Sequence, residues 1–276
     1  MDLTLQAIVL GIVQGLTEFL PVSSSAHLIV LPQWLGWDDP FLNSNAFDVM
    51  LHLGTLLALV AYFWRDLWRY LRAWLASLAE RRIGGDADRR LAWLLIITVI
   101  PGALLGAGGE SFFDTFFRQR SSIYIAILLC IGAAFLWLGE RQGDRSRGME
   151  GLGVRDAILI GLAQALALFP GMSRSGTTIG AGLLLGLERE AAARFSFLMS
   201  APIIAGAVVL KGKDLVVAGV PTDELLPLLA GMAAAVFFGL LAVTSLLAWL
   251  RRRSTDVFIA YRVLLAAAIV VVVLSR

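Results

Sequence analysis

Glu18 is a carboxylate inside an apolar stretch of the chain, and its neighbourhood could support chemistry. It follows Gln14 by four residues, so the two side chains share one face if the stretch is helical. A carboxylate in hydrocarbon costs several kcal/mol unless it is paired or hydrated. Glu18 is therefore a candidate functional residue, and the alternative is a salt bridge between helices.

A serine-rich turn comes next. Pro21 ends the helix, and Ser23, Ser24 and Ser25 are suited to cap a following one. For Ser23, capping and ligand binding are equally open. His27 comes three residues after Ser24, so it lies within one helical turn of the serines. A histidine in that place could act as a general acid and base.

A second polar turn, at residues 170–178, carries the cation Arg174 between apolar segments. The planar fork of an arginine suits a phosphate. Hydroxyl groups and free amides at the start of a helix add donors to an anion. The alternative is an ion pair between Arg174 and Glu18 without a ligand. The candidate phosphate ligands of this turn are Ser173, Arg174, Ser175 and Thr178.

Composition identifies the setting of these two turns. The chain has 276 residues, of which 58% are hydrophobic and 16% are charged, and its mean hydropathy is +0.80. A soluble domain carries roughly 25% charged residues. The chain is therefore predicted to be a polytopic membrane protein without a separate soluble domain. Its arginines cluster between apolar runs, which indicates topology signals and not nucleic-acid binding.

Two of the apolar runs differ from ordinary spans, which need about 20 residues. The run at 3–22 ends at the serine turn, and the run at 157–172 ends at the second polar turn. Both resume as short apolar pieces, at 28–35 and 179–187. This pattern predicts a broken or re-entrant helix pair in each half. The other runs fall at 47–64, 91–108, 121–139, 195–210, 225–250 and 257–274.

The two broken segments are copies of each other. Residues 157–177 repeat residues 7–27 at a constant offset of 150, with 8 identities in 21 positions. Chance would give roughly two in so skewed a composition. Arg174 takes the place of Ser24 in this repeat.

Basic residues indicate how the two halves sit in the membrane. If both broken segments are re-entrant and the N-terminus lies outside, 16 arginines fall in cytoplasmic loops and 5 basic residues fall outside. If both segments cross fully, the best split is 13 to 8. The positive-inside rule favours the re-entrant model. The five outside residues are Arg118, Arg120, Lys211, Lys213 and Arg276.

The sequence thus predicts an all-α polytopic membrane protein of two inverted-topology repeats, at residues 1–140 and 154–276. Each repeat holds one re-entrant broken-helix hairpin and three transmembrane helices, which gives six full spans and places both termini outside. The hairpins cover 3–35 and 157–187. Inversion should bring the two polar turns together near the membrane midplane.

Acidic, hydroxyl and cationic groups in one place are what phosphoryl transfer requires, namely positioning, charge neutralisation and an activated nucleophile. Glu18 could also hold a hard divalent cation that bridges phosphate oxygens. Asp48 and His52 could border this site, although a salt bridge or cap at the end of a span is favoured. Arg262, in the last apolar run, is expected to extend its charged end to the membrane interface.

At these two turns the sequence resembles the undecaprenyl-diphosphatase family, also called the bacitracin resistance protein family. The resemblance is carried by Gln14 to Glu18, Pro21 to His27 and Pro170 to Thr178, and by the pattern of spans over nearly the whole chain. Many members carry Glu where this chain has Gln14, which leaves one carboxylate for a metal. Ala26 replaces a more usual glycine.

The resemblance implies hydrolysis of undecaprenyl pyrophosphate to undecaprenyl phosphate and inorganic phosphate, aided by a divalent cation such as Mg²⁺ or Ca²⁺. The reaction would occur at the outer face of the bacterial plasma membrane. It would recycle the lipid carrier of peptidoglycan and other envelope polymers, and overproduction would confer bacitracin resistance. The implied partners are the pyrophosphate lipid and the surrounding membrane, and an oligomer is possible.

A hypothesis for the mechanism follows. Arg174 binds the pyrophosphate together with Ser173, Ser175 and Thr178. Further candidate ligands are Gln14 and Ser23. Ser24 is the nucleophile or aligns an attacking water. His27 carries the proton, and Glu18 orients His27 or the cation.

Two other classes of function remain open. A lipid flippase or transporter is the main alternative, because inverted repeats with broken helices are transporter architecture. An ion channel is disfavoured, since no ring of like groups and no polar pore-lining span is visible in the sequence.

Overall fold

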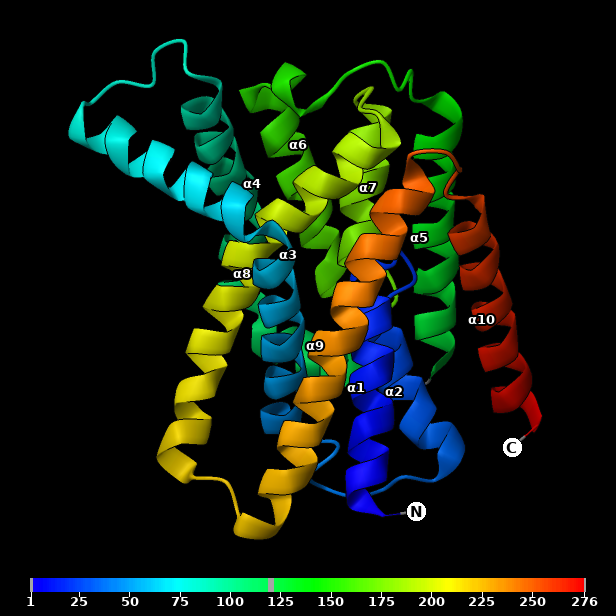
Figure 1. Ribbon diagram of the computed structural model, residues 1–276. Helices are drawn as coiled ribbons and strands as arrows, with labels where there is room; N and C mark the ends of the chain where they lie inside the picture. Colours follow the sequence, from blue (N-terminus) through cyan, green and yellow to red (C-terminus); the bar gives the residue numbers. More distant parts are fainter. Residues whose placement is uncertain (1, 119–121, 276) are drawn as a thin grey trace.

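The computed structural model describes residues 2–118 and 122–275, except for the side chains of 45–46, 106–118, 211 and 214–218. The described chain is helical, in two successive sets that each begin with two short α-helices and continue with three long ones (Figure 1). The first set is α1 (Leu3–Phe19), α2 (Ser24–Leu35), α3 (Asn45–Ala79), α4 (Ala87–Arg118) and α5 (Ser122–Gln142). The second is α6 (Val154–Ala165), α7 (Arg174–Leu184), α8 (Arg189–Ala218), α9 (Thr222–Leu250) and α10 (Asp256–Ser275).

Both predicted helix breaks are present. α1 ends at Phe19 and α2 begins at Ser24, so the first break coincides with the serine turn. α6 is followed by a 3-10 turn, η2 (Leu166–Leu168), before α7 begins at Arg174. In Figure 1, α1 ends beside the middle of α9, and α2 runs back toward the end of the molecule where α1 begins.

Among the described residues, five helices are long and apolar enough to cross a membrane, which supports an integral membrane protein. They are Phe47–Ala79, Ser122–Gln142, Arg189–Leu210, Thr222–Leu250 and Asp256–Ser275. The predicted span 91–108 falls within α4, partly among residues whose side chains are outside the description, so the total of six spans stays a prediction. Of the predicted outside charges, Arg120 and Arg276 lie outside the described residues, and the description leaves out the side chains of Arg118 and Lys211.

The two halves interleave. α1 lies along α9, and α6 lies along α4, so each first helix packs on a long helix of the other half (Figure 1). α3 meets α8, and α5 packs on both α7 and α10. One hydrophobic cluster accordingly contains Phe19 and Leu59 together with Ile160, Leu198 and Val243. The polar turns at the ends of α1 and α6 therefore lie inside a shared core.

α3 is longer than the predicted run at 47–64. It continues to Ala79 past a kink at Phe63 (φ −101°, ψ 16°), and the extension leans away from the bundle in Figure 1. The predicted run stopped there because charged residues follow, but arginine is a good helix former and the helix continues. Asp66 in this extension pairs with Arg194 of α8 at 2.8 Å. Apolar side chains exposed along the extension, three or four residues apart, are Trp64, Trp68, Leu71, Leu75 and Leu78.

The contact between α1 and α9 depends on small residues. A Cβ atom at Gly11 would collide with the backbone carbonyl of Gly231, and one at Gly15 would lie 2.8 Å from the carbonyl oxygen of Ala235. The backbones can approach this closely because neither glycine has a side chain, as is common where helices cross in membranes.

We expect Gly11→Ala to lower the thermal stability of the purified protein in detergent, because over-packing costs about 1–3 kcal/mol. Gly206→Ala in α8 is the matched control, since no atom lies within 4 Å of the added Cβ and alanine favours a helix. Equal melting temperatures for the two variants would show that the close contact of α1 with α9 does not exist.

Candidate active site

The two polar turns share one backbone conformation. Ser23 (φ 77°) and Ser173 (φ 66°) both have positive φ, which is uncommon for residues with a side chain. Each caps the helix that follows: Ser23 Oγ accepts from the Ala26 amide at 3.4 Å, and Ser173 Oγ accepts from the Gly176 amide at 3.1 Å. The capping role considered for Ser23 is thus present, and the two copies in the sequence form the same turn in the structure.

Ser24 and Arg174 are therefore equivalent in position. Each is the first residue of a short helix, α2 or α7, directly after the capping serine. Backbone amides and the positive end of the helix dipole favour an anion at such a place. The repeat puts a hydroxyl at one helix start and a guanidinium at the other.

Glu18 joins the two helix starts. Its Oε1 atom accepts a hydrogen bond from Arg174 Nη2 at 2.9 Å, and its Oε2 atom accepts one from Ser24 Oγ at 2.6 Å. Gln14 Nε2 donates to the same Oε2 atom at 3.2 Å. The Glu18 side chain is 7% exposed and that of Arg174 15%. This buried group brings together four of the predicted site residues.

This arrangement can activate a hydroxyl beside an anion site. A serine that donates to a carboxylate at such a short distance can transfer its proton there as it attacks an electrophile. Arginine has five N–H donors, and Arg174 gives one of them to Glu18. Its fork can therefore bind an anion placed over the two helix starts.

His52 of α3 also borders the site, which the sequence had left open. Its Nε2 atom lies 3.9 Å from Glu18 Oε2, and its side chain is 38% exposed. Its Nδ1 atom donates to the backbone carbonyl of Asp48 at 2.7 Å. The Nε2 atom is therefore the ring nitrogen that faces Glu18. The spacing of four residues between Asp48 and His52 identified them as candidates. It could not predict that α3 packs on α1 and so brings His52 to Glu18.

His27 is held on the other side of the serine turn. Its Nδ1 atom donates to the Ser23 carbonyl at 2.7 Å, and its Nε2 atom is 2.7 Å from the Tyr261 hydroxyl. The two rings are stacked with centroids 5.7 Å apart. Among the described residues, the hydrogen bonds of Glu18 go to Ser24, Gln14 and Arg174 and none goes to His27.

The remaining predicted ligands build the turns. Ser175 Oγ donates to the Leu20 carbonyl at 3.0 Å and so ties the second turn to the first break. Thr178 Oγ1 donates to the Arg174 carbonyl at 2.7 Å and lies 2.6 Å from the Ser196 hydroxyl. Both residues are at most 2% exposed.

The expectation that Arg262 extends to the membrane interface is wrong. Arg262 is 0% exposed and its guanidinium lies behind the two turns. It donates to the carbonyls of Gly171 and Met172 at 2.7 and 3.0 Å, and to that of Pro21 at 3.3 Å. The breaks leave these carbonyls without helical partners, which explains why the side chain turns inward.

The residues present fit a cation only in part. Among the described residues, no group of three or more His, Cys, Asp and Glu side chains could hold a metal. The amide oxygen of Gln14 is nevertheless buried without a hydrogen-bond partner in the described chain, next to the Glu18 carboxylate. Mg²⁺ is commonly held by one or two protein oxygens together with substrate phosphates. The oxygens of Gln14 and Glu18 therefore fit a cation that is also bound by the phosphate of a substrate.

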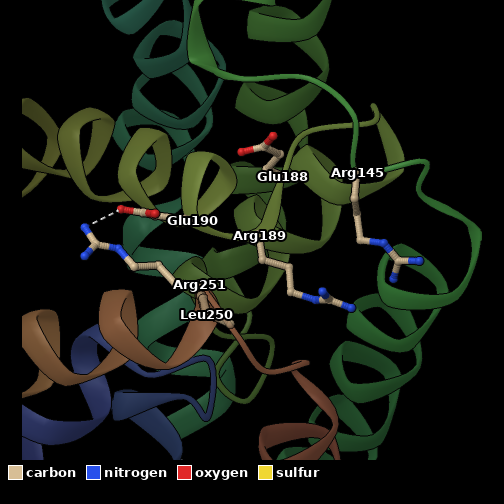
Figure 2. A pocket seen from close by; sticks show the side chains of 6 residues that line it. All are labelled: Arg145, Glu188, Arg189, Glu190, Leu250 and Arg251. Atoms are coloured by element: carbon tan, nitrogen blue, oxygen red, sulfur yellow. Dashed lines mark hydrogen bonds and ion pairs between the residues drawn. The ribbon is translucent and has the colours of Figure 1, made fainter.

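A polar pocket lies away from the two turns. Figure 2 shows its lining: Arg145, Glu188, Arg189, Glu190, Leu250 and Arg251. It has a volume of about 230 Å³ and sits where α5 and α9 end and α8 begins. Its charges largely neutralise each other, since Arg251 pairs with Glu190 at 2.8 Å and both Arg145 and Arg189 pair with the buried Glu140. Its lining contains no hydroxyl side chain.

Comparison with known proteins places these turns in a family. The family model for "Bacitracin resistance protein BacA" matches residues 7–268, a range that includes both turns. The chain belongs to this family. The resemblance inferred from the motifs is thereby confirmed.

Relatives in the BacA family cover almost the full length. A protein of Thermomicrobium roseum is 49% identical over 273 residues, which is 97% of each chain. One of Moorella thermoacetica is 51% identical over 269 residues, again 97% of each chain, and one of Rubrobacter xylanophilus is 46% identical over 270 residues, 98% of each. All three are named undecaprenyl-diphosphatase.

The buried Glu18–Arg174 pair should show strong thermodynamic coupling. We expect Glu18→Ala or Arg174→Ala alone to destabilise by about 3–5 kcal/mol, because each leaves a buried charge without its partner. The double variant should cost clearly less than the sum. Unfolding of the four proteins in detergent measures this coupling.

The exposed pair of Arg141 and Asp256, which are 3.0 Å apart, is the matched control. Exposed pairs contribute about 0–1 kcal/mol. If the cycle through Glu18 and Arg174 gave no more coupling than this pair, the buried ion pair between the two turns would be refuted.

Proposed function

We propose that this chain hydrolyses undecaprenyl pyrophosphate to undecaprenyl phosphate and inorganic phosphate. The reaction recycles the lipid carrier of cell-wall polymers, and excess enzyme confers bacitracin resistance. The observation that carries the proposal is the contact of Glu18 with both Ser24 and Arg174 at two helix starts. The near full-length relatives named undecaprenyl-diphosphatase support the substrate.

The pyrophosphate binds where two helix N-termini and Arg174 converge. Arg174 and the amides at the start of α2 and α7 neutralise its charge. Since Arg174 is bonded to Glu18 at 2.9 Å in the free protein, the phosphate shares this guanidinium with the carboxylate. Ser23, Ser173 and Ser175 hold the shape of the two turns through their own hydrogen bonds.

Ser24 attacks the terminal phosphorus. An Oγ–P bond forms while the bond between that phosphorus and the bridging oxygen breaks, and undecaprenyl phosphate leaves. Glu18 takes the hydroxyl proton, because it already accepts the Ser24 hydrogen bond at 2.6 Å. Water then attacks the phosphoserine, which releases phosphate and returns a proton to Ser24. In the alternative route Ser24 aligns a water for direct attack, and acid quenching with labelled terminal phosphate distinguishes the two by trapping label on Ser24.

Two histidines are available for the protons. His52 lies closer to Glu18, at 3.9 Å, and is partly exposed, so it can exchange the proton that the carboxylate receives. His27, held by Ser23 and Tyr261, is placed to serve the leaving group on the opposite side of the serine turn. A divalent cation, held by Glu18 and the free amide oxygen of Gln14, would supply further neutralisation of phosphate charge.

The topology that fits this function has the site open to the outer face of the bacterial plasma membrane. We place both termini outside and treat the two halves as inverted repeats with six spans. α1 begins and α10 ends toward one end of the molecule, and α9 ends toward the other (Figure 1). The arginine-lined pocket of Figure 2 lies where α9 ends. The positive-inside rule supports a cytoplasmic position for that pocket.

A lipid flippase is the second candidate function. The observation that favours it is the meeting of two broken helices from opposite halves at Glu18 and Ser175. Movement of labelled lipid across proteoliposomes tests it, and release of phosphate from purified protein tests hydrolysis.

We expect Arg174→Ala to reduce phosphate release from undecaprenyl pyrophosphate in detergent at least about 100-fold, because it removes the main charge that stabilises the transition state. Arg174→Lys should recover part of the loss, since it restores a point charge without the fork. Arg253→Ala is the control, because this arginine is exposed and stacks over Trp249. Normal hydrolysis by Arg174→Ala would overturn the proposed function.

A further inference from the structure

Arg262 is a fully buried cation in the middle of α10. Its guanidinium donates to backbone carbonyls from three other segments. Pro21 belongs to the first turn, Gly171 and Met172 belong to the second, and Leu129 belongs to α5. In the described part of the chain no carboxylate lies within ion-pair distance of it. A buried charge with carbonyl partners alone is expensive, so it calls for a physical explanation.

The neighbouring helices leave space for this guanidinium by lacking side chains. A Cβ atom at Gly132 of α5 would collide with Arg262 Nη2, and one at Gly176 of α7 would lie 2.6 Å from Nη1. Gly176 is also the residue whose amide is capped by Ser173. Two helices therefore form a slot that fits the Arg262 fork.

The carbonyls explain why a cation fits here. The oxygens of Pro21, Gly171 and Met172 lie between helices, so they lack helical partners. Water is scarce at membrane depth, so these oxygens need donors from the protein. One guanidinium supplies donors to both breaks at once, which no lysine could do with the same planar geometry.

The bound carbonyls are close in sequence to the reacting groups. Pro21 precedes Ser24 by three residues, and Met172 precedes Arg174 by two. Between them stand Ser23 and Ser173 with positive φ, a conformation that persists only where the surroundings hold it. The position of each helix start thus depends on carbonyls that Arg262 binds.

We infer that Arg262 is a positioning residue that holds the two turns in register, so that Ser24 and Arg174 meet the same pyrophosphate. This inference deepens the proposed function and rests on it. Arg262 acts through the backbone of both turns and does not touch the substrate. Its own positive charge, behind the two helix starts, also favours the bound anion.

The test compares Arg262→Met and Arg262→Lys with wild type in steady-state hydrolysis of undecaprenyl pyrophosphate. We expect kcat to fall about 100-fold in Arg262→Met with a much smaller change in KM, because a misplacement of about 1 Å costs that much. Arg262→Lys should recover little, since it keeps the charge and loses the fork. Arg252→Met, an exposed arginine between α9 and α10, is the matched control.

A second readout does not depend on activity. The coupling between Glu18 and Arg174, measured by the double-mutant cycle, should drop when the cycle is repeated with Arg262→Met, because the two turns lose their register. Gly132→Ala, which obstructs the slot and keeps the charge, should reproduce both effects if Arg262→Met fails to fold.

The outcomes separate the claims. If wild type releases no phosphate, the proposed function fails, and the change in coupling still tests positioning. If wild type is active and a folded Arg262→Met or Gly132→Ala keeps normal kcat and normal coupling, the positioning role is overturned. A loss of thermal stability alone, at unchanged kcat per folded molecule, would likewise assign Arg262 a purely structural role.

Discussion

The ion pair between Glu18 and Arg174 is the interaction on which the rest of the site depends. It lies in a core shared by both halves, where an unpaired charge would be costly. To form it, α1 ends directly after Glu18, and α7 begins at Arg174 at the same depth. The broken helices, the interleaved packing of α1 on α9 and α6 on α4, and the glycines between α1 and α9 all serve this meeting.

The repeat then allows two different uses of one turn. Ser23 and Ser173 have the same strained backbone and the same capping bond, so the start of each following helix is oriented alike. The next residue differs, and the difference sets the chemistry. In the proposed reaction, Ser24 provides a nucleophile beside a carboxylate, whereas Arg174 provides a ligand for phosphate charge. Similar geometry with different side chains is how two halves can act on one pyrophosphate.

Much of this site could be predicted from the sequence, because polar residues in an apolar chain are few and the repeat aligns them. Glu18, Ser24 and Arg174 were identified by type and position, and the structure brings them together. The family followed from the two motifs. Helix breaks were predicted at both turns because proline disfavours a helix interior and serines favour the start of a new helix.

Other features depended on tertiary contacts that no local pattern encodes. From the sequence, Arg262 resembled an arginine at the membrane interface. Only the structure shows that it donates to backbone carbonyls at both helix breaks. His52 reaches Glu18 only because α3 packs where it does, and the partner of His27 is a tyrosine 234 positions away. The extension of α3 to Ala79 carries Asp66, whose partner Arg194 comes from the other half.

The most direct test of the account is an experimental structure of the protein with a diphosphonate analogue of the lipid, in which carbon replaces the bridging oxygen. The account predicts that the terminal phosphorus lies about 3–3.5 Å from Ser24 Oγ, with Arg174 bonded to the same phosphonate. A headgroup bound away from both turns, for example in the arginine-lined pocket of Figure 2, would contradict it.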